Sequence, residues 1–187
     1  MTLPRWPATV PTLTDDVVTL RAWEPGDADA VLAACSDPDV ERWTPLPSPY
    51  LPEHAAGFVG RAAPKRWASG RAAPFAVVSA TGGEVLGFCG LVRVDEVDLV
   101  GEIGYWTAPW ARGLGVAQRG VRLVVGWAFA ELDLFRLEFL VDVDNLASRR
   151  VAERIGCGFE GVLRGKSLHR GVRRDLALYA LLRSSPD

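Results

Sequence analysis

A glycine-containing loop at residues 112–117, with the sequence Arg-Gly-Leu-Gly-Val-Ala, is the part of the chain best suited to hold a ligand. It follows a strand-like run that ends at Thr107 and opens a helical run that reaches about Leu132. Gly113 and Gly115 let the backbone turn tightly and approach a ligand closely. The first N–H groups of a helix have no partner within it, and the positive end of the helix dipole lies behind them. The loop is therefore suited to bind a phosphate group.

Spacing excludes two common phosphate-binding motifs at this loop. A P-loop needs G-x-x-x-x-G-K-[ST], but Gly115 is followed at the fifth position by Gly120 and then by Val121, so the lysine is missing. A dinucleotide-binding loop needs G-x-G-x-x-G/A, but the third residue after Gly115 is Gln118. The pattern R-x-x-G-x-A remains. Taken alone, it also fits a glycine-rich turn that only packs a helix on a sheet.

The composition narrows the class of protein. The chain has 187 residues, of which 49% are hydrophobic and 24% charged, as in one globular domain. The formal net charge of −2 argues against a general nucleic-acid-binding protein. The cysteines at 35, 89 and 157 form no C-x-x-C pair and no histidine cluster accompanies them, so we expect no metal site. Free thiols and the absence of a long apolar run predict a cytoplasmic protein that does not enter a membrane.

The order of the expected elements indicates a single α/β (α+β) domain over residues 16–183. Strands are expected at 17–21, 75–79, 85–94, 97–107, 136–143, 159–164 and 173–182. Helices are expected at 27–35, 52–67, 115–132 and 146–155. This order predicts a mixed, mostly antiparallel, twisted sheet of about seven strands flanked by helices. Residues 1–15 are expected to form an extended N-terminal arm, and residues 184–187 a frayed tail.

Three motifs, in this order, resemble the GNAT superfamily of acyl-CoA-dependent N-acyltransferases. They are Glu-Ile-Gly-Tyr-Trp at 102–106, the loop at 112–117, and Asn-Leu-Ala-Ser-Arg-Arg-Val at 145–151 followed by residues 155–164. More narrowly, the chain resembles the branch that contains the ribosomal-protein N-terminal alanine acetyltransferases. The strong match covers residues 99–164, and the order of elements extends it over about 15–182.

The resemblance implies a GNAT fold, in which the strands at 97–107 and 136–143 run parallel and splay apart at one end. The pantetheine arm of acetyl-CoA, the implied cosubstrate, enters that gap. The family's cofactor-binding positions fall here on the strand residues Tyr105, Trp106 and Thr107, on the loop residues Arg112, Gly113, Leu114, Gly115, Val116 and Ala117, and on Asn145 and Ser148. Asn145 followed three residues later by Ser148 is also a good helix N-cap without any ligand. Both interpretations of Asn145 stay open.

Attack of an amine on a thioester requires a base for the amine proton, a donor for the oxyanion and a group that stabilises the leaving thiolate. Ser148 is the catalytic candidate near the sulfur. Glu102 is the candidate base, because it begins a strand beside the expected cleft, although it is equally suited to pair with Arg93 on the neighbouring strand. Some relatives carry a carboxylate after their sixth strand, and the matching position here is Ser167, so the base stays open.

The acceptor is expected beside Trp43 and Tyr50, which lie in a proline-rich segment, and the alternative is that this segment only covers the core. Basic residues gather in the last hairpin, where they could bind an acidic acceptor or the CoA 3′-phosphate. The alternative is that they only form a solvent-exposed surface. We expect transfer of an acetyl group from acetyl-CoA to a primary amine, either a peptide N-terminus or a small molecule. The alternative is an acyl-CoA sensor without turnover. The family resemblance implies a possible homodimer, and the net charge and the lack of a long apolar run predict no nucleic-acid or membrane partner.

Overall fold

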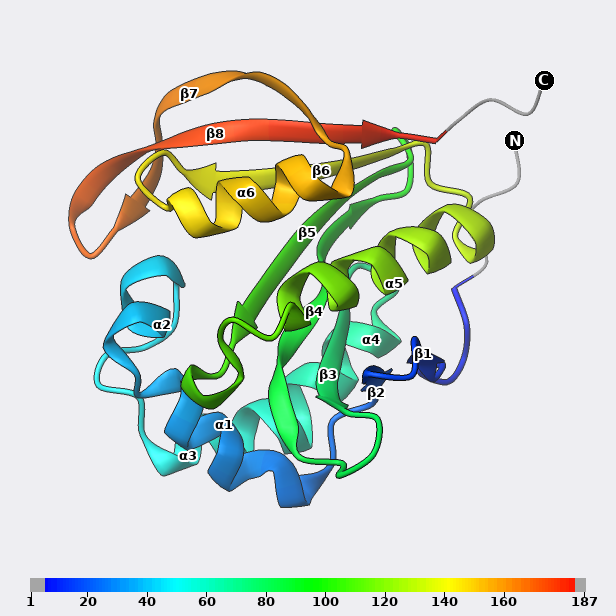
Figure 1. Ribbon diagram of the computed structural model, residues 1–187, viewed down its shortest axis with the longest axis vertical. Coiled ribbons are helices and arrows are strands. Elements are labelled where there is room, and N and C mark those ends of the chain that lie inside the picture. Colours follow the sequence, from blue (N-terminus) through cyan, green and yellow to red (C-terminus); the bar gives the residue numbers. More distant parts are fainter. Residues whose placement is uncertain (1–5, 184–187) are drawn as a thin grey trace.

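In the computed structural model, which describes residues 6–183, one sheet runs through the molecule and helices cover both of its faces (Figure 1). The strands are β1 (Leu13–Thr14), β2 (Val18–Arg21), β3 (Ala73–Ser79), β4 (Val85–Asp95), β5 (Val100–Thr107), β6 (Arg136–Asp142), β7 (Gly158–His169) and β8 (Val172–Leu182). Their order in the sheet is β1-β2-β3-β4-β5-β6-β8-β7. All neighbouring strands pair antiparallel except β5 and β6, which are parallel. The expected mixed α/β fold is confirmed, with eight strands instead of about seven.

The helices are α1 (Ala28–Cys35), α2 (Pro38–Trp43), α3 (Pro52–Gly57), α4 (Ala63–Ala68), α5 (Val116–Glu131) and α6 (Leu146–Ile155). Single turns of 3₁₀-helix occupy Pro25–Asp27 and Pro109–Ala111. The helix expected at 52–67 is present as α3 and α4, joined by a π-helical turn at Phe58–Ala62. A turn of this kind widens the helix locally, which periodicity in the sequence does not report.

The additional strand, β1, lies within the segment expected to be an extended arm. Leu13–Thr14 pairs with β2, and earlier in the segment the ring of Trp6 packs against those of Trp67 and Trp127 at centroid distances of 5.3 and 6.3 Å. This aromatic cluster attaches the described part of the segment to the core. The expected tail at 184–187 lies outside the described residues.

The parallel pair separates after three residues. β5 and β6 are in register only from Val100 opposite Arg136 to Glu102 opposite Glu138. Beyond Glu102, β5 continues beside β4 and β6 continues beside β8, so each strand follows its antiparallel partner (Figure 1). The right-handed twist of a sheet turns neighbouring strands away from one another, and no ladder holds these two together here. The splayed arrangement that the resemblance implied is present.

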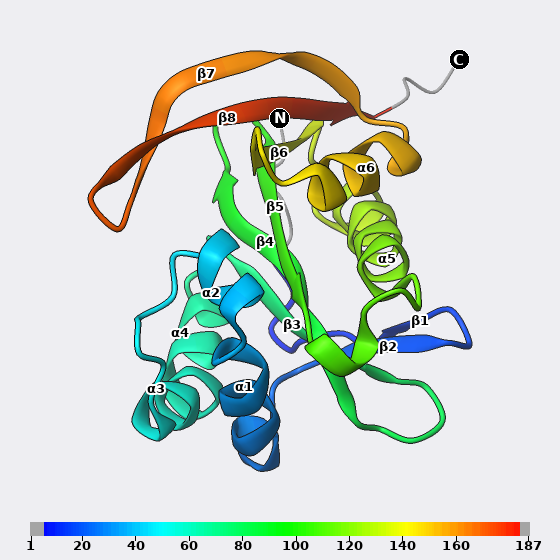
Figure 2. The same cartoon turned by 60° about the vertical axis from the view of Figure 1, so that its left-hand side comes forward.

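The two faces of the sheet carry different helices (Figure 2). α5 and α6 cover one face, and α1 to α4 cover the other. On α5, Val121, Val124 and Ala128 are fully buried against the sheet, as their helical spacing predicted. The opening between β5 and β6 is therefore bordered by one helical layer on each side.

An ion pair between Arg21 and Asp27 holds the end of β2 against the start of α1. Two hydrogen bonds of 2.8 and 2.9 Å join the guanidinium to the carboxylate, and the backbone N–H of Glu24 donates a third at 2.8 Å. Burial opposes ionisation of Asp27, but the hydrogen bonds from Arg21 and Glu24 outweigh it and hold the pKa of the carboxyl below its ordinary value. The pair therefore stabilises the folded state above the unfolded-state pKa of about 3.9. That stability is lost as the pH falls through the lower folded-state pKa.

We expect Asp27→Asn to lower the free energy of unfolding by about 3 kcal/mol at neutral pH, because it leaves the Arg21 charge without its partner. Urea unfolding monitored by circular dichroism measures this. Asp29→Asn, at an exposed position on the first turn of α1, is the matched control and should change stability by less than about 1 kcal/mol. If Asp27→Asn and Asp29→Asn had the same free energy of unfolding, the Arg21–Asp27 ion pair would not stabilise the fold.

Candidate active site

A cavity of about 1150 Å³ lies where β5 and β6 separate. α6 and the loop before α5 line it on one side, and α1, α2 and the segment after α2 line it on the other. Its volume is at the upper end for a small-molecule site, so it has room for two substrates. The following predicted residues line it: Trp43, Tyr50, Glu102, Tyr105, Trp106, Thr107, Arg112, Gly113, Gly115, Val116, Ala117, Asn145 and Ser148. Leu114 is the one predicted site residue that does not, and its side chain is exposed.

The loop before α5 presents unpaired backbone donors to this cavity. Gly113 and Gly115 have φ angles of +78° and +73°, a left-handed conformation that other residues adopt only with strain. Within the described part of the chain, the N–H groups of residues 113–118 donate no hydrogen bond. Six unpaired donors at the positive end of a helix are well placed to hold a diphosphate.

The side chain of Arg112 binds α2 rather than the loop to which it belongs. Its guanidinium pairs with Asp37 and, at 3.3 Å, with Asp39. Asp37 also caps α2, since its side chain accepts hydrogen bonds from the N–H groups of Asp39 and Val40. Burial opposes ionisation of Asp37, but Arg112 and the capped N–H groups hold the pKa of its carboxyl below its ordinary value. This contact joins the two helical layers across the cavity.

Two hydroxyl groups meet at the wall of the cavity formed by α6. The hydroxyl of Ser148 lies 2.5 Å from that of Tyr105, which also donates to the Ser148 carbonyl at 3.2 Å. Burial raises the pKa of Tyr105 to about 12, so its hydroxyl keeps its proton at neutral pH. Asn145 caps α6 by accepting a 3.0 Å hydrogen bond from the Ser148 N–H. The capping interpretation of Asn145 thus holds, and its side chain also borders the cavity.

Glu102 lies at the point where the two strands part. Its carboxylate is 3.5 Å from the Nε of Arg93 on β4, so the cross-strand pair exists, and Glu102 also lines the cavity. Burial, followed by the nearby Glu138 carboxylate, raises the pKa of Glu102, although Arg93 partly offsets this. A carboxylate with a raised pKa is a better proton acceptor than an ordinary one. The two interpretations of Glu102 are therefore compatible.

The side of the cavity that faces α1 and α3 is aromatic. Tyr50 is buried, and burial raises its pKa, while Trp43 lies beneath the Arg42 guanidinium at 4.5 Å. The sequence interpretation missed two further parts of this wall, Phe88 and the ring of Trp106, which stack at a centroid distance of 6.4 Å. Alternation along β5 places Trp106 on the face opposite Tyr105 and is the signal that would have found it.

The sequence interpretation also missed the hydroxyl of Tyr105 and the carboxylates of Asp37 and Asp39. Their partners are distant in the chain, since 43 residues separate Tyr105 from Ser148 and 75 separate Asp37 from Arg112. No spacing rule in one sequence reports such contacts. Among the described residues, no group of His, Cys, Asp or Glu side chains is arranged to hold a metal ion. No helix in the same residues is long and apolar enough to span a bilayer.

Comparison with known proteins finds one family model, described as acetyltransferase (GNAT) domain, which matches residues 18–158. YdaF of Bacillus subtilis (strain 168), whose name assigns it to ribosomal N-acetylation, is 38% identical over 101 residues, or 54% of this chain and 55% of YdaF. The N-acetyltransferase p20 of Bacillus licheniformis is 28% identical over 172 residues, or 92% of this chain and 96% of p20. The solved structure of Mycobacterium smegmatis RimJ in complex with CoA-disulfide has a TM-score of 0.82 and 27% identity, covering 97% of this chain and 90% of RimJ.

Proposed function

Since the chain belongs to the GNAT family of acetyltransferases and transfers an acetyl group from acetyl-CoA to an amine, we propose how its cavity performs that reaction. The observation that supports the proposal is that all the groups needed for the reaction border one cavity. Unpaired N–H groups at residues 113–118, the free edge of β5 and the hydroxyls of Tyr105 and Ser148 all border one cavity.

We place the diphosphate of acetyl-CoA on the loop, at residues 112–117. The N–H groups there need acceptors, and a diphosphate supplies several charged oxygens. The pantetheine arm then lies along Tyr105, Trp106 and Thr107, since β6 has already left this edge of β5. Asn145 and Ser148, at the start of α6, border the pantetheine arm on the side away from β5. The structure of RimJ, which is similar over most of both chains, was solved in complex with CoA-disulfide, and this supports CoA as the ligand.

The reaction begins with a neutral amine and the thioester held in the gap. The amine nitrogen bonds to the thioester carbon as its proton passes to Glu102, directly or through water. A backbone N–H on the free edge of β5 donates to the oxyanion. The carbon–sulfur bond then breaks, and a proton from the Tyr105–Ser148 pair reaches the sulfur. The proton taken up by Glu102 is released to solvent, and the pair regains one from solvent, which restores both groups. The products are the acetylated amine and the CoA thiol, and positioning of the two substrates supplies much of the rate.

Thiol release from acetyl-CoA in the presence of a panel of amines tests this function. We expect the CoA thiol to be released only when a suitable amine is present. The amount of acetylated amine should equal the amount of thiol released. Tight binding of acetyl-CoA without release for any amine would instead support the acyl-CoA sensor.

We expect Glu102→Gln to lower kcat/KM by roughly 100-fold. A base works when it is deprotonated, so wild-type activity should fall as the pH drops through the raised pKa of Glu102. In the variant, kcat/KM should no longer fall at acidic pH for this reason, so this acidic limb of the profile is lost. The only pH dependence left should come from the acceptor α-amine, whose pKa is about 8. The pH profile of kcat/KM measures both.

Glu138→Gln is the control for this profile. Glu138 is opposite Glu102 in the β5–β6 register and does not line the cavity. Because its charge raises the pKa of Glu102, the variant should stay active with its acidic limb moved to lower pH. An unchanged acidic limb in Glu102→Gln would assign the base to another group.

We also propose that the enzyme works in the cytoplasm, without nucleic-acid or membrane partners, and forms a homodimer. The family resemblance supports the homodimer, and light scattering of the purified protein tests it. A particle with the mass of one chain would contradict it.

A further inference from the structure

The tip of the β7–β8 hairpin rests on α2 at the acceptor side of the molecule (Figures 1 and 2). Arg170 at the tip pairs with the Glu41 carboxylate at 2.8 Å and donates to the Glu41 carbonyl at 3.2 Å. A second cavity, of about 280 Å³, lies between the two elements. Its basic residues are Arg42, His169, Arg170 and Arg174, which we call the basic rim.

The basic rim adjoins the large cavity through α2. Asp39, Val40 and Trp43 of this helix line the large cavity, while Pro38, Glu41 and Arg42 line the small one. A second link is Arg174, whose Nε is 4.0 Å from the carboxylate of Asp142, a residue of the large cavity. A ligand leaving the large cavity past α2 therefore meets the rim.

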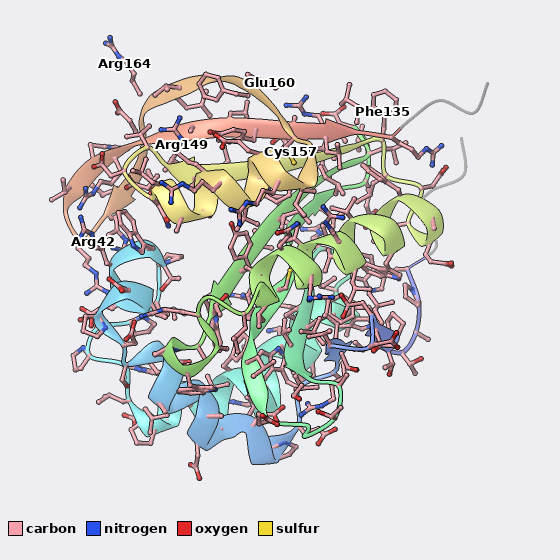
Figure 3. The ribbon with its side chains drawn as sticks, in the orientation of Figure 1. Arg42, Phe135, Arg149, Cys157, Glu160 and Arg164 are labelled. Carbon is pink, nitrogen blue, oxygen red and sulfur yellow. The ribbon has the colours of Figure 1, made fainter. Side chains whose placement is uncertain are left out.

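The rim has positive charge that its neighbours do not fully neutralise. Glu41 pairs with Arg170, but the Arg42 guanidinium lies over the Trp43 ring, and no ion pair with a carboxylate is found for it among the described residues. Figure 3 shows Arg42 where α2 meets the hairpin tip. The Nε of Arg174 is buried and has no hydrogen-bond partner in the described structure. The Arg42 guanidinium and the exposed part of the Arg174 side chain, whose Nε faces Asp142, suit an incoming carboxylate.

Near the reacting groups the large cavity carries the carboxylates of Glu102 and Asp142, although arginines at 66, 71, 93, 112 and 154 also line it. The Glu102 carboxylate is 3.5 Å from the Nε of the exposed Arg93, and the charges of Arg93 and Lys166 both act on it. Asp142, the partner of Arg174, also lines the cavity. An ammonium group is attracted to this inner region, where it loses its proton to react. The reacting amine thus meets the Glu102 carboxylate, and the part of the acceptor that follows it meets the basic rim.

Resting on the proposed function, we infer that the acceptor is the free N-terminus of a polypeptide with acidic side chains just after it. Its α-amine enters the large cavity beside Glu102, and its carboxylates bind the basic rim. A polyamine fits less well, because a cation trailing behind the reacting amine would lie against Arg42 and Arg174. No residue of the loop at 112–117 lines the small cavity, so the rim is distinct from the proposed phosphate site.

A set of peptides tests this inference. They share the same N-terminal residue and carry acidic, neutral or basic residues at the next four positions, and spermidine serves as the polyamine. We expect kcat/KM to fall from acidic to neutral to basic peptides, and the advantage of the acidic peptide to shrink as salt is added. Arg42→Gln combined with Arg174→Gln should lower kcat/KM for the acidic peptide by about tenfold. It should leave the neutral peptide and the KM for acetyl-CoA unchanged.

Arg61→Gln, at an exposed position outside both cavities, removes a like charge and is the matched control, with no change expected. Equal kcat/KM for all peptides, or a preference for spermidine, would overturn the inference while leaving acetyl transfer intact. Strong inhibition of acidic-peptide acetylation by an RNA oligonucleotide would assign the rim to nucleic acid and would also overturn the inference. If no amine at all releases thiol, the proposed function itself fails.

Discussion

Removing both hydroxyls at the sulfur end of the cavity, by Tyr105→Phe combined with Ser148→Ala, should lower kcat by about 10²- to 10⁴-fold. The two oxygens are 2.5 Å apart, and burial keeps the proton on Tyr105, which is why we propose the pair as the proton donor for the leaving thiolate. The KM for acetyl-CoA should change little, because the phosphate loop is intact. Steady-state thiol release measures both constants.

Each single variant should lose less activity than the double variant, since the remaining hydroxyl still faces the sulfur. Tyr179→Phe is the matched control. Tyr179 is buried, its hydroxyl contacts Arg149 and Glu153, and it does not line the cavity. It should keep its kcat. A double variant with the wild-type kcat would show that neither hydroxyl serves the thiolate.

Gly115→Val should weaken acetyl-CoA binding by roughly 10- to 100-fold. Gly115 has a φ of +73° and precedes α5, and a β-branched residue there must either accept strain or rotate the neighbouring N–H groups away from the diphosphate. Isothermal titration calorimetry with acetyl-CoA measures the change.

Gly126→Val is the control for added bulk in the same helix. Gly126 is exposed, a Cβ there would meet nothing within 4 Å, and its backbone is helical. We expect wild-type affinity for acetyl-CoA. Equal affinities of the two variants and the wild type would place the diphosphate away from this loop.

The local features of the site could be predicted because short segments specify them. Gly115 before a helical run and Asn145 three residues before Ser148 have the backbone conformation and the cap expected of them. The separation of β5 from β6 came from the family resemblance, since no residue within either strand encodes it. Strand β1 was missed because a strand of two residues is too short to show a period.

The contacts between distant segments could not be predicted. The Tyr105–Ser148 pair and the contact of Arg112 with α2 depend on how the layers pack, and a single sequence does not report this. Leu114 shows a further limit: its position in the motif marked it as a site residue, but its side chain is exposed and it does not line the cavity. Glu102 had two interpretations because the same carboxylate both pairs with Arg93 and borders the cavity.

A crystal structure of the protein with acetyl-CoA tests the central claim most directly. The account predicts diphosphate oxygens within hydrogen-bonding distance of the N–H groups at residues 113–118, and the thioester sulfur beside the hydroxyls of Tyr105 and Ser148. A diphosphate held elsewhere, with the pantetheine arm outside the gap between β5 and β6, would contradict it.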